Sequence, residues 1–165
     1  MNYNAISIIT LYKKEVQRFI KIPLQTIVAP AGTSLLFLVI FTTAIGSVRV
    51  DYPLSDFKSF LFPGLIMMTI IQNAFMNNSS SILMSKVQGN IVDLLMPPLN
   101  NVEIISAFTL AGITRGLIVA FACGLVMLPF VDVSFFSIGI IIIFAVLASA
   151  VMSLVGLISG IWAVS

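Results

Sequence analysis

The chain has 165 residues, of which 59% are hydrophobic and only 8% are charged, and its net charge is +2. An ordinary soluble domain carries about 25% charged residues, roughly three times the fraction found here. This low charge and the mean hydropathy of +1.15 together exclude a soluble globular protein. The sequence has no histidine, a single cysteine and no G-x-x-x-x-G-K-[ST] string, which excludes histidine catalysis, a Cys/His metal site, a disulfide framework and a nucleotide-binding P-loop.

The charged residues are unevenly distributed along the chain. Residues 23–48, 59–85, 104–128 and 135–165 contain one charged side chain between them, Arg115. Apolar runs of this length are typical of transmembrane helices. We therefore predict an all-α, polytopic membrane helix bundle with four spans, built as one transmembrane domain over residues 1–165.

Residues 5–21 are predicted to form an amphipathic helix at the membrane interface. The basic residues come late and are interleaved with apolar ones, which argues against a signal peptide. The apolar stripe is Ala5, Ile8, Ile9, Tyr12, Val16, Phe19 and Ile20, and the polar stripe is Lys14, Gln17, Arg18 and Lys21. Such a helix places its cations at the lipid headgroups. A solvated basic arm is the alternative.

Pro23 is expected to break the chain before the first span, residues 22–48, because proline lacks an N–H donor. The second span, residues 59–84, is apolar around Pro63 and polar in its second half. That half contains Gln72, Asn73 and Asn77. These side chains should avoid lipid, and they either line a substrate path or form hydrogen bonds between helices. Both readings stay open.

Residues 85–103 form the largest internal polar loop, and within it residues 89–96 are predicted to be a short apolar helix that ends before Pro97 and Pro98. A helix this apolar outside the bilayer is suited to a groove on a partner protein. It could also lie on its own membrane surface. Asn100 is predicted to cap the third span, with Glu103 at the third helical position.

The third span, residues 104–128, contains Arg115. A charge within a span can be a functional residue, but no span contains an acidic partner, so we expect Arg115 either to reach the headgroups or to meet Asp93 or Glu103. The fourth span covers residues 135–164. Small residues at four-residue spacing allow helices to approach closely. The candidate packing positions are Gly112, Gly116, Gly156 and Gly160.

The distribution of lysine and arginine predicts the orientation of the chain. With a cytoplasmic N-terminus, the inner segments hold Lys13, Lys14, Arg18, Lys21 and Lys86, whereas the outer segments hold Arg49 and Lys58. The positive-inside rule therefore favours a cytoplasmic N-terminus and a cytoplasmic 85–103 loop. The net charge is too small to indicate a nucleic-acid partner, and the partner expected from composition is the lipid bilayer.

Two segments carry a family resemblance. They are Phe62-Pro63-Gly64-Leu65-Ile66-Met67-Met68, followed by the Asn/Ser stretch, and Lys86-x-Gln88-x-x-Ile91-x-Asp93-Leu94-Leu95-x-x-Pro98. Together with the amphipathic N-terminal helix, they resemble the ABC-2 type transporter permease family, in particular its bacterial inner-membrane branch that includes the nodulation-factor exporters. That family has six spans, so we expect this sequence to lack the last ones.

The resemblance implies a permease of an exporter for an amphiphile, an oligosaccharide-like compound or a drug. It implies that the 85–103 loop is the coupling helix, which contacts a separate cassette ATPase through Lys86, Gln88, Gly89, Ile91, Asp93, Leu94, Leu95 and Pro98. The chain would then be no enzyme itself, would pair with a second permease copy, and would leave ATP and Mg²⁺ to the ATPase. The alternatives are a self-sufficient four-span channel or facilitator and a membrane assembly protein.

Overall fold

The computed structural model describes residues 3–46, 54–92, 96, 99–131 and 137–163, and these residues contain helices and no strand. In chain order the elements are α1 (Tyr3–Ile20), a π-helical turn η1 (Leu24–Val28), α2 (Ala29–Gly46), α3 (Leu54–Val87), α5 (Asn101–Met127), a 3₁₀ turn η2 (Leu128–Phe130) and α6 (Ile138–Trp162). The predicted all-α class is confirmed.

Four segments are long and apolar enough to cross a membrane. They are Leu24–Ala44, Phe57–Val87, Asn101–Phe130 and Ile138–Trp162. Each corresponds to one span predicted from the sequence, and the predicted boundaries differ from the observed ones by a few residues. The chain is therefore a multi-pass membrane protein.

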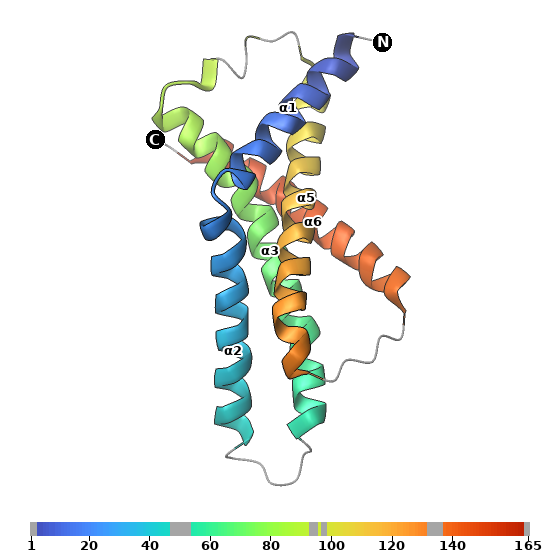
Figure 1. Ribbon diagram of the computed structural model, residues 1–165. Coiled ribbons are helices and arrows are strands. Elements are labelled where there is room, and N and C mark those ends of the chain that lie inside the picture. Colours follow the sequence, from blue (N-terminus) through green and yellow to red (C-terminus); the bar gives the residue numbers. More distant parts are fainter. Residues whose placement is uncertain (1–2, 47–53, 93–95, 97–98, 132–136, 164–165) are drawn as a thin grey trace.

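Helices α3 and α5 form the centre of the bundle, because α3 packs against α2, α5 and α6, and α5 packs against α1, α2, α3 and α6. Figure 1 shows α2, α3 and α5 running roughly side by side, with α6 crossing them obliquely. Helix α1, the end of α3 and the start of α5 lie at one end of the bundle. The end of α2 and the start of α3 lie at the opposite end. The N-terminal helix and the flanks of the 85–103 loop therefore share one end, as the predicted topology requires.

Two prolines shape the connection between α1 and α2. Helix α1 ends at Ile20, and the chain resumes a helical path at Pro23, where the sequence predicts a break. Sequence reasoning gave no role to Pro30, whose ring would clash with the carbonyl of Thr26 in a regular α-helix. The turn before Pro30 is instead π-helical, and the Ala29 N–H donates to the Leu24 oxygen. Such wider turns accommodate irregularities in helices.

Helix α1 lies against the bundle, which refines its predicted placement. Its Leu11 and Phe19 are buried, and its Tyr12 hydroxyl is 2.9 Å from the Thr114 hydroxyl of α5. Ile9 and Ile20 are exposed, as the lipid-facing half of the predicted stripe should be. The apolar face is thus divided between the protein and the surroundings.

Helices α3 and α6 pack closely through small residues. A Cβ atom built on Gly156 would overlap the backbone oxygen of Phe75, and one on Gly160 would lie 3.1 Å from the Ile82 Cβ. Ser149 and Ser153, on the same stripe of α6, are fully buried. On α5, a Cβ on Gly112 would overlap the Ser153 hydroxyl.

Gly116 lies at the remaining close contact of this kind, where a Cβ would be 3.4 Å from the Ile70 oxygen of α3. The four glycines singled out in the sequence therefore all lie where α3, α5 and α6 approach one another. The absence of side chains at these positions sets the distances between the three helices.

Candidate functional site

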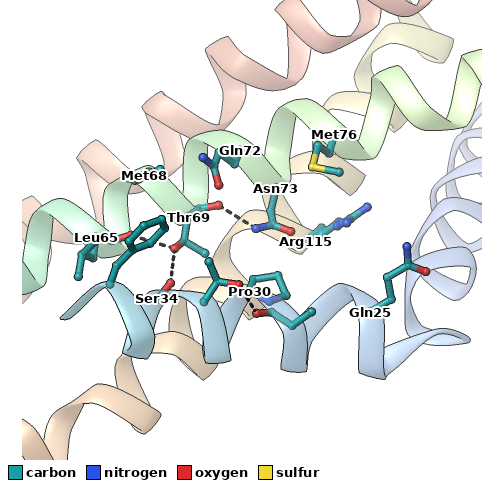
Figure 2. Close-up of a pocket in the computed structure, with 13 residues that line it drawn as sticks. Gln25, Pro30, Ser34, Leu65, Met68, Thr69, Gln72, Asn73, Met76 and Arg115 are labelled. Atoms are coloured by element: carbon teal, nitrogen blue, oxygen red, sulfur yellow. Dashed lines mark hydrogen bonds between the residues drawn. The ribbon is translucent and has the colours of Figure 1, made fainter. Parts of the chain in front are cut away.

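A pocket of about 240 Å³ lies between α2 and α3, with α5 behind it. Figure 2 shows the side chains that line it, with Thr69 and Asn73 of α3 pointing toward α2. The polar members of the lining are Gln25, Thr33, Ser34, Thr69, Gln72, Asn73 and Arg115. Two of the three side chains predicted for a substrate path, Gln72 and Asn73, are therefore placed in one pocket.

The floor of this pocket is held by short hydrogen bonds. The Ser34 and Thr69 hydroxyls are 3.0 Å apart, which ties α2 to α3. Thr69 Oγ1 donates to the Leu65 oxygen at 2.8 Å, and Asn73 Nδ2 donates to the Thr69 oxygen at 3.0 Å. Backbone carbonyls one turn earlier thus satisfy these groups within α3, so the floor is ordered before any ligand arrives.

Arg115 enters the same pocket from α5 and is only 7% exposed. Its Nε is buried and has no hydrogen-bond partner in the described part of the chain. The expectation that it reaches the headgroups is wrong, because the bundle encloses it. It does not meet Glu103 either, whose carboxylate accepts from the Asn100 N–H at 2.8 Å. Asp93, the other expected partner, lies outside the described residues.

Asn77, the third candidate for a substrate path, lies further along α3 in a different network. Arg18 Nη2 donates to the Asn77 backbone oxygen at 2.7 Å, and Asn77 Nδ2 donates to Asn78 Oδ1 at 3.1 Å. Asn78 Nδ2 in turn donates to the oxygen and hydroxyl of Ser153, at 2.9 and 2.6 Å. This network joins α1, α3 and α6.

The two interpretations of the polar half of α3, a substrate path and hydrogen bonds between helices, therefore apply to different residues. Gln72 and Asn73 border a pocket, whereas Asn77 and Asn78 are fully buried hydrogen-bonding groups between helices. The side chain at the centre of the second group, Asn78, belongs to the polar half that the sequence predicts to avoid lipid, but it was not among the candidates for the substrate path. The sequence around Asn78 could not indicate this role, because its hydrogen-bond partner Ser153 is 75 residues away.

We expect Asn78→Ala to lower the stability of the bundle more than Asn73→Ala does. The first substitution removes two hydrogen bonds between α3 and α6, and such bonds contribute roughly 1–2 kcal/mol in membranes. The second removes one bond within α3. Thermal unfolding of the purified variants in detergent measures the difference, and equal midpoints would show that the network does not join the helices.

The loop after α3 begins with a helix-ending motif. Gly89 has a φ of +72°, and its N–H donates to the Lys86 oxygen while the Asn90 N–H donates to the Ser85 oxygen. These two bonds and the left-handed glycine form a Schellman motif. The structure thus gives Gly89 a reason to be present that is independent of any ATPase contact.

Lys86 also has a partner within the chain. Its Nζ donates to the carbonyl oxygens of Ile161 at 2.6 Å and Ala163 at 2.7 Å. A cation at these carbonyls stabilises the C-terminal end of α6. Gln88 is exposed and Ile91 begins a helical turn. Asp93, Leu94, Leu95 and Pro98 lie outside the described residues, so their part in a coupling helix remains a prediction.

Two apolar side chains of the loop are exposed. The Met96 N–H donates to the Val92 oxygen at 2.8 Å, which holds the two residues close together. Val92 is 55% exposed and Met96 is 77% exposed. The loop therefore presents a small apolar surface, and both residues belong to the short helix predicted over residues 89–96.

Nearly the whole chain is similar to known proteins. Residues 6–165 match the model of the ABC-2 type transporter family. The chain is 35% identical over 163 residues to "Inner membrane transport permease YadH" of Escherichia coli K12, and equally to its counterparts in Escherichia coli O157:H7 and Shigella flexneri. These alignments cover 99% of this chain and 64% of each relative. No solved structure matches.

Proposed function

The chain belongs to the ABC-2 type transporter family, and we propose that it forms part of the permease of an ATP-binding cassette exporter. Its four spans and its inner-membrane relatives place it in the bacterial inner membrane as a multi-pass protein. The exporter would move an amphiphile, an oligosaccharide-like compound or a drug. A separate cassette ATPase would bind ATP and Mg²⁺ and supply the energy.

The observation that carries this proposal is the exposed apolar turn of the 85–103 loop. A turn with Val92 and Met96 exposed leaves apolar surface without cover from the described residues of the bundle. Each of these side chains would gain roughly 1.5–3 kcal/mol on full burial. A groove on a partner protein provides that burial, whereas a self-sufficient channel has no need of such a turn.

The orientation and partners follow from the same end of the bundle. Helix α1, with Lys13 and Lys14 exposed and the exposed Lys21 directly after it, and the flanks of the loop lie together there (Figure 1). We place this end in the cytoplasm, where the ATPase and ATP are available. Two permease copies and two ATPases would form the working unit, and closure of the ATPases on ATP would move the two coupling loops together.

Co-expression of the chain with cassette ATPases from the same organism tests the proposal. We expect one of these ATPases to co-purify with the tagged chain from detergent extracts, and its rate of ATP hydrolysis to differ from that of the isolated ATPase. A four-span membrane protein unrelated to transporters serves as the control for adventitious association. Absence of co-purification and an unchanged hydrolysis rate would overturn the proposal.

A further inference from the structure

The pocket between α2 and α3 contains a positive charge whose countercharge is not provided by the described side chains. Arg115 is buried in the bundle, with an exposed fraction of 7%. Its Nε makes no hydrogen bond in the part of the chain that the structure describes. A buried charge without a partner is strongly unfavourable, and a charge within a span is a functional residue by default.

The carboxylates whose side chains the structure describes are already used elsewhere. Glu15 is paired with Arg18 at 3.1 Å, and Glu103 accepts from the Asn100 N–H at the start of α5. The electrostatics of this region therefore favour an anion that comes from outside the described residues.

The shape of the pocket indicates which kind of anion fits. Its floor is polar and buried, with Ser34, Thr69 and Asn73 beside Arg115. Its rim is more exposed and mixed, with Met68 at 44% and Met76 at 53% beside the exposed polar side chains of Gln25, Thr33 and Gln72. Figure 2 shows Arg115 extending into the space between α2 and α3, beside Asn73. An anionic headgroup suits Arg115, and because the pocket lies between two spans, apolar tails on that headgroup would extend along the methionines into the surrounding lipid.

We propose that this pocket binds the phosphate group of an anionic amphiphile, with Arg115 as the main ligand-binding residue. A guanidinium donates two parallel hydrogen bonds to phosphate, and the second N–H of the Asn73 amide, whose first N–H donates to the Thr69 oxygen, is a further donor. The amphiphile is either a membrane phospholipid or the transported molecule. The inference deepens the proposed function, on which it rests, by naming the class of molecule that the permease binds between α2 and α3.

Binding to the purified chain in detergent tests the site without any ATPase. The probes are short-chain phosphatidic acid, the matched neutral diacylglycerol and inorganic phosphate. We expect saturable binding of phosphatidic acid, and a loss of about tenfold in affinity in Arg115→Gln, the range expected when a hydrogen bond to a charged group is removed. Arg115→Lys should retain part of the affinity, because lysine keeps the positive charge but cannot donate the two parallel hydrogen bonds of a guanidinium.

Lys14→Gln is the matched control, because it removes a positive charge from an exposed position on α1. It should leave the affinity within about twofold, as surface charges act weakly at physiological salt. Thermal unfolding gives a second readout. Phosphatidic acid should raise the unfolding midpoint of the wild-type chain but not that of Arg115→Gln, which shows that the variant is folded and unable to bind.

Three results would overturn the inference. They are equal binding of diacylglycerol and phosphatidic acid, unchanged affinity in Arg115→Gln, and binding of inorganic phosphate as tight as that of phosphatidic acid, which would indicate a free anion as the ligand. Replacing phosphatidic acid with lipids extracted from the expressing cells distinguishes a resident phospholipid from a cargo molecule. Because no ATPase is present, failure here leaves the proposed function intact, and loss of ATPase association leaves this site intact.

Discussion

Replacing both Val92 and Met96 with aspartate is expected to abolish co-purification of the cassette ATPase while the membrane bundle stays folded. The two residues are joined by the Met96 N–H to Val92 oxygen hydrogen bond, and their side chains are 55% and 77% exposed. Burial of both in a partner would contribute roughly 3–6 kcal/mol. Two carboxylates in the same groove would also have to lose their hydration, so the association constant should fall by several orders of magnitude.

Asn90→Asp is the matched control for this experiment. It introduces a negative charge at an exposed position in the same loop without removing apolar surface, and aspartate caps helices about as well as asparagine. We expect wild-type recovery of the ATPase with this variant. Size-exclusion profiles of all three proteins establish that the bundle is intact. Recovery of the ATPase with the double aspartate variant would show that this turn is not the coupling helix.

The four spans could be predicted from the sequence because the membrane imposes length and composition on each helix separately. An uncharged apolar run from Ile138 to Trp162 indicates a transmembrane helix, whatever surrounds it. The caps are also local. Glu103 and Asn100 are three residues apart, and their hydrogen bond forms within a single turn. Such features need no knowledge of the other helices.

The roles of individual polar residues depended on partners far away in the sequence. Lys86 fits a family pattern, but its ammonium group reaches carbonyls at the end of α6, 75 and 77 residues further on. Arg115 could be interpreted only after the positions of α2 and α3 were known. Spacing within α3 put Asn73 and Asn77 on one face, yet α1 covers one of them and a pocket borders the other.

Gly156→Leu is expected to have the largest effect of any single substitution on the stability of the bundle. Even the Cβ of Gly156→Ala would overlap the Phe75 backbone oxygen. That atom belongs to the backbone of α3 and cannot rotate away as a flexible side chain can. Overpacking of this kind costs about 1–3 kcal/mol for a small increment. Leucine adds three further carbon atoms at the same contact, so α6 must separate from α3.

Gly139→Leu is the comparison that isolates packing from helix propensity. Gly139 is on the same helix, and a Cβ built there meets no atom within 4 Å. Leucine forms helices better than glycine does, so this variant should unfold at or above the wild-type temperature in detergent. Gly156→Ala should unfold below it, and Gly156→Leu lower still. Equal unfolding midpoints for the two leucine variants would mean that α6 does not rest on α3 at Phe75. Because Asn78 and Ser153 bridge the same two helices, separation at Gly156 should also break the hydrogen bonds between them.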